Sequence, residues 1–207
     1  MSIFDRLILL ATGLVAIYAI WRFYTRYSKE KARHDIYYAL GFFVLLVSGL
    51  LLIALGWGIL ASPYILTVAT LIPLGLSMGL MHQFVPQYKK AYSWFALAGL
   101  LTIAVTSIGN MALKSVAVPV FHGVAGLIIF GLPLYRCFVT KEAPKGFGAI
   151  SLGGVLISLG GMALAFLNAD KQLLFFSSDV VMAILAPLLL LMALAFTWGF
   201  VKDIKAD

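Results

Sequence analysis

The sequence predicts an all-α integral membrane protein, a bundle of seven transmembrane helices with the N-terminus outside and the C-terminus in the cytoplasm. Of its 207 residues, 63% are hydrophobic and 11% are charged, whereas soluble domains typically contain about a quarter charged residues. Apolar runs of about 20 residues, long enough to cross a hydrocarbon core of about 30 Å as a helix, recur along the whole chain. The distribution of Lys and Arg between the connections predicts the orientation.

Seven apolar runs are separated by short polar or charged connections. The predicted spans cover residues 3–23, 36–60, 64–84, 91–113, 118–140, 146–168 and 179–202. The first run lacks the small-residue cleavage site of a signal peptide, so we expect an uncleaved span. The connection at 24–35 is the most charged part of the chain and is expected to be a loop. Because most connections are very short, consecutive helices should be antiparallel neighbours in a single membrane domain that covers residues 1–207.

Proline residues support the boundaries of several spans. Pro63 and Pro119 stand near the starts of the third and fifth spans, where the first amide groups have no intrahelical partner in any case. Pro73, Pro133 and Pro187 fall inside spans, where a proline removes a backbone hydrogen bond. We therefore expect kinks in the third, fifth and seventh helices.

Lys and Arg are divided unequally between the two ends of the expected bundle. Twelve lie at the end that carries the 24–35 connection and the C-terminus, and three, Arg6, Lys114 and Lys171, lie at the other. Positively charged loops stay in the cytoplasm, so the richer end should be cytoplasmic and the number of spans odd. We expect a plasma (inner) membrane location. The net charge of +7 serves topology and attraction to lipid headgroups, and nucleic acid is not an expected partner.

Glycine motifs predict where helices approach each other closely. Gly75 and Gly79 form a small-xxx-small motif in the third span. In the sixth span the sequence Ser-Leu-Gly-Gly occurs twice, seven residues apart, which places both glycine pairs on one helix face. These glycines are Gly153, Gly154, Gly160 and Gly161. The face would pack within the bundle; the alternatives are a contact with a second protein chain and a groove for a flat lipid or pigment.

The charged residues indicate that the interior of the bundle carries no catalytic group. No Asp, Glu, Lys or Arg falls in the middle of a span, whereas proton-coupled transporters usually keep carboxylates there. Retinal is excluded, because no span contains the lysine that a Schiff base needs. The motifs of serine hydrolases, zinc proteases and phosphate-binding loops are also missing. We therefore expect neither an enzyme nor a metal site.

His122 is the histidine that the predicted spans place inside the membrane, about one turn into the fifth span. A haem or chlorophyll needs such a ligand. His82 lies at the opposite end of its own span, so the two histidines cannot be axial ligands of one haem. A haem or chlorophyll site with His122 as its single ligand stays open, beside the simpler interpretation that this imidazole forms a hydrogen bond to a neighbouring helix.

Uncharged polar side chains suggest a binding site in the third to sixth spans. Thr102, Thr106 and Asn110 stand at four-residue spacing and would share one helix face. The full set of these polar residues is Thr70, Ser77, Thr102, Thr106, Asn110 and Asn168. Together with His122 they would form a small outward-facing pocket for a neutral or amphipathic ligand. In the alternative interpretation, the hydroxyl groups bond their own i−4 carbonyls, and Asn and His join helices.

Three classes of function remain open. The lack of buried charge and the packing motifs favour a non-catalytic multi-pass protein, either an accessory subunit of a membrane complex or a small seven-helix receptor or sensor. The second class is a facilitator or binding protein for a neutral or lipophilic solute, with the polar pocket as its site. The third is a haem- or pigment-binding membrane subunit that uses His122. The expected partners are the lipid bilayer and a membrane protein or a second copy of the chain.

Overall fold

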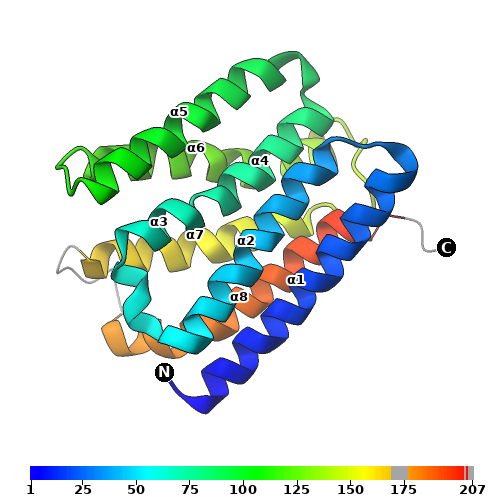
Figure 1. Cartoon of the computed structure of the whole chain (residues 1–207). Helices are drawn as coiled ribbons and strands as arrows, with labels where there is room; N and C mark the ends of the chain where they lie inside the picture. The colour runs from blue at the N-terminus through cyan, green and yellow to red at the C-terminus, as the bar shows by residue number, and fades with distance from the viewer. Residues whose placement is uncertain (169–176, 203, 205–207) are drawn as a thin grey trace.

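The computed structural model describes residues 1–168, 177–202 and 204, with the side chains of 165–168 left out, and this part of the chain is helical without strands (Figure 1). Six helical segments are long and apolar enough to cross a membrane, and a seventh apolar helix is slightly shorter over its described residues. Helices of this length and hydropathy are typical of integral membrane proteins. The predicted all-helical membrane class is therefore confirmed.

The helices follow one another through short connections. They are α1 (Ile3–Glu30), α2 (His34–Leu55), α3 (Pro63–Ala69), α4 (Leu71–Phe84), α5 (Lys89–Ile108), α6 (Lys114–Leu134), α7 (Ala149–Asn168) and α8 (Ser178–Val201). Two 3-10 turns, Trp57–Ala61 and Pro86–Tyr88, precede α3 and α5, and a π-helical turn, Tyr135–Val139, continues α6. The third predicted span is interrupted at Thr70, because Pro73 has no amide that could donate to the Ala69 carbonyl.

The charged connection expected at residues 24–35 is largely helical. α1 continues to Glu30 and α2 begins at His34, so three residues join the two helices. Lys31 ends α1 in the left-handed conformation with φ 54°, and its amide donates to the Tyr27 carbonyl at 2.9 Å. Arg, Lys and Glu are good helix formers, so the helix continues where its apolar pattern stops. The 28 residues of α1 make it about 42 Å long, which exceeds the thickness of a hydrocarbon core.

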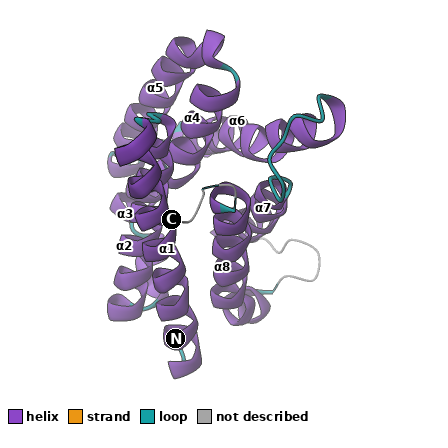
Figure 2. Ribbon diagram, turned by 90° about the vertical axis from the view of Figure 1, so that its right-hand side faces the viewer, coloured by secondary structure: helices purple, strands orange, loops and turns teal. Residues whose placement is uncertain are grey.

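Six helices form a ring. Each helix in the series α1, α2, α4, α6, α7 and α8 contacts the next, and α8 contacts α1. Figure 2 shows α8 between α1 and α7. α5 lies outside the ring, against α3, α4 and α6. The ring brings the first and last helices together, although they lie at opposite ends of the sequence.

Aromatic and aliphatic side chains fill part of the ring. Phe23 of α1 and Phe42 of α2 have ring centroids 5.6 Å apart, and Tyr38 lies 4.3 Å from Phe200 of α8. These residues belong to one buried cluster with Leu80 of α4. Lipid is as apolar as these side chains, so the contact between the helices is stabilised by close packing of complementary shapes.

The outward faces of the helices are also apolar. Leu14 of α1, Leu101 of α5 and Leu127 of α6 are 61%, 56% and 70% exposed. A soluble protein rarely exposes so many large apolar side chains together. On helices of this length they form the surface that contacts acyl chains.

The two glycines of α4 let it approach α2 closely. A Cβ atom at Gly75 would lie 2.9 Å from the Tyr37 carbonyl oxygen, and one at Gly79 would lie 2.2 Å from the Tyr38 ring. These distances leave no room for a methyl group. The small-xxx-small motif of the third predicted span therefore packs within the chain.

Three of the four glycines in the repeated motif of α7 also contact neighbouring helices. A Cβ at Gly153 would lie 2.6 Å from the Phe196 ring of α8, and Gly154 lies against α6. Gly160 lies against α8, whereas Gly161 has no neighbour within 4 Å. Since Gly161 is also exposed, the repeat faces the bundle over most of its length but not at its last position.

Replacement of Gly79 by Ala should destabilise the protein, because the added methyl group collides with the Tyr38 ring. We expect a loss of about 1–3 kcal/mol in the free energy of unfolding, the usual cost of overpacking. The matched control is Gly161→Ala, which meets no neighbour and should leave this free energy unchanged or raise it by up to about 1 kcal/mol, because alanine favours a helix over glycine. Unfolding in mixed micelles measures both, and equal losses would contradict the close contact at Gly79.

Candidate functional site

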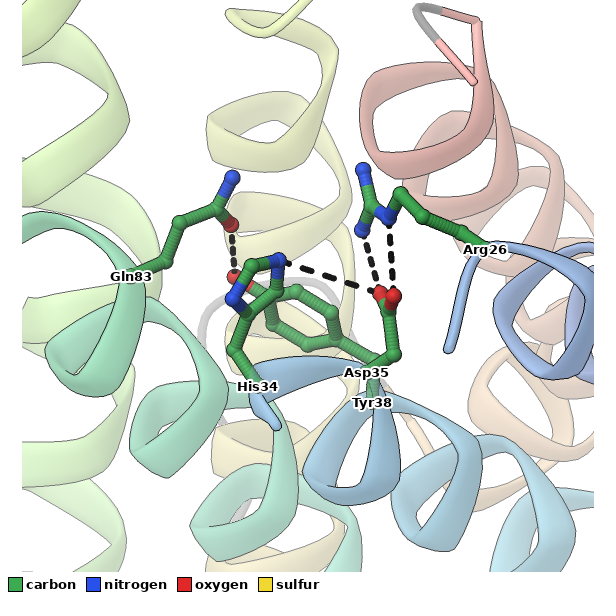
Figure 3. Close-up of polar contacts among 5 residues, drawn as sticks. All are labelled: Arg26, His34, Asp35, Tyr38 and Gln83. Carbon is green, nitrogen blue, oxygen red and sulfur yellow. Dashed lines mark hydrogen bonds and ion pairs between the residues drawn. The ribbon is translucent and has the colours of Figure 1, made fainter. Parts of the chain in front are cut away.

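A polar cluster lies where α1, α2 and α4 meet at one end of the bundle (Figure 3). It consists of Arg26 near the end of α1, His34, Asp35 and Tyr38 in the first two turns of α2, and Gln83 at the end of α4. We call this the basic end, because the turn between α1 and α2 and the start of α5 carry several Lys and Arg residues.

An ion pair between Arg26 and Asp35 lies at the centre of the cluster. Arg26 Nε donates to Asp35 Oδ2 at 2.8 Å, and Arg26 Nη2 donates to Asp35 Oδ1. The Asp35 side chain is 1% exposed and that of Arg26 is 13% exposed. Two-pronged pairing of this kind is strong and directional. Because a buried charge is costly when unpaired, the pair holds the end of α1 against the start of α2.

Tyr38 links this ion pair to two further helices. Its hydroxyl group donates to Gln83 Oε1 of α4 at 2.8 Å. Its fully buried ring contacts Phe200 of α8 and Phe23 of α1, with a centroid distance of 5.5 Å to Phe23. One side chain on α2 thus contacts α1, α4 and α8.

His34 lies beside the ion pair without a hydrogen bond to it. Its Nε2 atom is 3.9 Å from Asp35 Oδ1, beyond hydrogen-bond distance. The atom is buried and has no hydrogen-bond partner among the described residues. The ring lies edge-on to Tyr38 at 5.8 Å. Protonation of His34 would place a second cation next to a carboxylate that already binds Arg26.

A second group of polar contacts extends the cluster to α5. The Tyr37 and His82 rings lie 4.5 Å apart, and His82 Nε2 is 3.3 Å from Ser93 Oγ. The Tyr92 hydroxyl donates to Ser77 Oγ at 2.7 Å. These contacts join α2, α4 and α5, and one of them engages Ser77, a residue of the expected outer pocket, in a bond between two helices.

The hydroxyl groups expected to line that pocket bond their own helices. Thr70 donates to the Leu66 carbonyl at 2.8 Å, and Thr106 donates to the Thr102 carbonyl at 2.7 Å. Ser77 donates to the Pro73 carbonyl at 2.6 Å. Each is an i−4 bond, as the alternative interpretation of these residues requires.

Asn110 does not share a helix face with Thr102 and Thr106. α5 ends at Ile108, and Asn110 is an exposed residue of the following turn with φ 49°. Asn adopts this left-handed conformation more readily than most residues, so the helix ends earlier than its apolar pattern predicts. Asn168 is the last residue of α7, and its side chain lies outside the described part of the chain.

His122 lies on α6 and is partly buried. Its Nδ1 atom is buried and has no hydrogen-bond partner among the described residues. Over the same residues, no group of three or more His, Cys, Asp or Glu side chains is arranged to hold a metal ion. Among the described residues the structure thus shows no interhelical hydrogen bond from Nδ1 of His122 and no second ligand beside it, and its role in a haem or chlorophyll site stays a prediction.

An apolar cavity of about 150 Å³ lies between α7 and α8. Gly160 and Ala163 line it from α7, and Val181, Leu185 and Leu188 line it from α8. Gly160 therefore both contacts Leu188 of α8 and lines this cavity.

Comparison of the chain with known protein families, curated proteins and solved structures finds no match.

The polar cluster was not predicted from the sequence, because Arg26, His34 and Asp35 fall in the stretch expected to be a loop. One signal was available. Asp35 and Tyr38 stand three residues apart, which places them on one face if the helix begins before residue 35.

Replacement of Asp35 by Asn should destabilise the protein strongly, because it leaves the Arg26 charge buried without its partner. We expect a loss of about 3 kcal/mol in the free energy of unfolding. Glu142→Gln is the matched control: Glu142 pairs with Arg136 at 2.9 Å but is 66% exposed, so its loss should cost less than about 1 kcal/mol. The double variant Arg26→Met, Asp35→Leu should recover most of the stability. Equal losses in Asp35→Asn and Glu142→Gln would contradict this role of the ion pair.

Proposed function

We propose that the chain is a non-catalytic, seven-span protein of the plasma (inner) membrane that works by binding other proteins, as an accessory subunit of a membrane complex or a small receptor. The observation that carries this proposal is the distribution of polar groups. The described polar contacts between helices, and the buried ion pair, gather at the basic end. The hydroxyl groups of Thr70, Ser77 and Thr106 donate to carbonyls of their own helices. Such a bundle is suited to act as a scaffold that presents one polar end.

The proposed orientation in the membrane follows from the positive charge of the basic end. With the N-terminus outside and α7 counted as the sixth of seven spans, the basic end lies in the cytoplasm, in agreement with the excess of Lys and Arg there. The 20 residues of α7 give a helix about 30 Å long, which supports its counting as a span.

A solute facilitator has less support. It would need polar side chains that are free to exchange their bonds with a passing solute. The hydroxyl groups of Thr70, Ser77 and Thr106 are instead engaged by backbone carbonyls, and Asn110 lies in an exposed turn.

A haem- or pigment-binding subunit is the second candidate function, and one observation favours it. The buried Nδ1 atom of His122 lacks a hydrogen-bond partner among the described residues, and a buried polar atom without a partner is costly. A metal in a porphyrin or chlorin ring would satisfy one nitrogen of this imidazole.

The proposed orientation predicts which turns a membrane-impermeant maleimide can reach in intact cells. In a Cys137→Ser background, Ala112→Cys should be labelled from outside, because it lies in the exposed turn between α5 and α6. Gln87→Cys, in the exposed turn between α4 and α5, should be labelled only after permeabilisation. The opposite pattern would reverse the orientation, and labelling of both from outside would contradict an odd number of spans between the termini.

Native mass spectrometry of the protein, released gently from its own membrane, tests the proposed function. We expect added mass from one or more protein chains. A bare monomer in every mild detergent would contradict the subunit proposal. Added mass of a small molecule, with visible absorption that His122→Ala removes while the protein stays folded, would support the second candidate instead. Loss of the same signal in a matched Ser107→Ala variant would show that the effect is not specific to His122.

A further inference from the structure

The turn between α1 and α2 and the turn between α4 and α5 form one basic surface. We infer that this surface, which we call the double turn and define by Lys31, Arg33, Lys89 and Lys90, binds an acidic segment of a soluble cytoplasmic protein. The inference rests on the proposed function and adds the chemistry of the partner.

The two turns are held together by side-chain contacts. Tyr38 at the start of α2 bonds Gln83 at the end of α4 at 2.8 Å. The His82 ring contacts Tyr37, and its Nε2 atom is 3.3 Å from Ser93 Oγ. Ser93 in turn donates to the Lys89 carbonyl at 2.8 Å. Through these bonds α4 links the start of α5 to the start of α2, so the charges of the two turns lie at the same end of the bundle.

The charge of the double turn is positive and largely unneutralised. Residues 26–35 and 82–90 contain six Lys or Arg and two acidic residues. One of the acidic residues, Asp35, is buried against Arg26. Lys31, Arg33, Lys89 and Lys90 are exposed, and no ion pair involves them among the described residues. Carboxylates of a partner would meet unpaired cations at this surface.

The length of α1 places the α1–α2 part of the double turn beyond the lipid phosphates. Trp21 is 58% exposed on α1 and marks the membrane interface. Lys31 follows ten residues later, which is about 15 Å further along the helix axis. A headgroup layer is only about 5–8 Å thick. The turn between α1 and α2 thus projects beyond the layer where a lipid phosphate lies, and a soluble protein can reach it.

The polar cluster supplies hydrogen-bond donors at the same end of the bundle. Figure 3 shows the amide nitrogen of Gln83 and the third guanidinium nitrogen of Arg26 turned away from the ion pair, in the same direction. The Gln83 oxygen and the other two nitrogens of Arg26 are held by Tyr38 and Asp35. Both donors are therefore preorganised for oxygen acceptors, and a partner carboxylate is one of them.

Binding of a fluorescein-labelled peptide of alternating Glu and Ser tests the inference. The full-length protein is placed in nanodiscs of phosphatidylcholine, and binding is followed by fluorescence anisotropy at low salt. The variant K31Q/K89Q/K90Q should raise Kd about tenfold. The control K141Q/K145Q/K202Q loses the same charge from three exposed lysines of the same end and should raise Kd less than about twofold. Thermal unfolding confirms that both variants are folded.

Three results would overturn the inference. Equal weakening by both variants would show attraction to net charge only. No binding to the unchanged protein would show that the double turn is not a site for acidic peptides. Loss of peptide binding in nanodiscs that contain phosphatidylglycerol, together with lipid retention that K31Q/K89Q/K90Q abolishes, would assign the surface to lipid headgroups. In each case a protein partner found by native mass spectrometry would leave the proposed function standing, whereas its absence would remove both.

Discussion

A buried charge needs a partner, and this requirement organises one end of the molecule. Asp35 is almost fully buried at the first turn of α2, and Arg26 must lie beside it to neutralise its charge. The pair fixes the tight turn between α1 and α2, and with it the position of Tyr38. Tyr38 then determines where Gln83 of α4 and Phe200 of α8 lie. Four helices thus depend on one carboxylate and one guanidinium group.

Polarity is distributed according to the solvents that the helices meet. Large apolar side chains face outward along the spans, where acyl chains surround them. The hydroxyl groups of Thr70 and Thr106 donate to backbone carbonyls of their own helices, whereas Ser77 does so and also accepts a hydrogen bond from Tyr92 of α5. Bonds between helices gather where water begins. This separation explains why a function based on surfaces fits the chain better than one based on an internal path.

Local sequence patterns predicted some packing contacts well and some polar positions poorly. Gly75 and Gly79 were predicted to be at a helix contact, and they are, since a small residue allows backbones to approach wherever the partner lies. The 24–35 connection was predicted to be a loop, yet it is mainly helix, because apolar periodicity marks the membrane boundary and not the helix end. Asn110 was predicted to lie on a helix face that ends before it. His122 remains as predicted on its helix, but its single-ligand role is still a prediction.

The sequence by itself determined that the chain is a set of apolar helices, because length and hydropathy of each run depend only on local composition. It also determined which end is basic, since charges in short connections cannot move far from their helices. Only the tertiary structure decided that α8 returns to α1, that Asp35 is buried, and that the α1–α2 and α4–α5 turns form one surface. These features depend on contacts between residues far apart in the chain, which the spacing of residues along the chain does not specify.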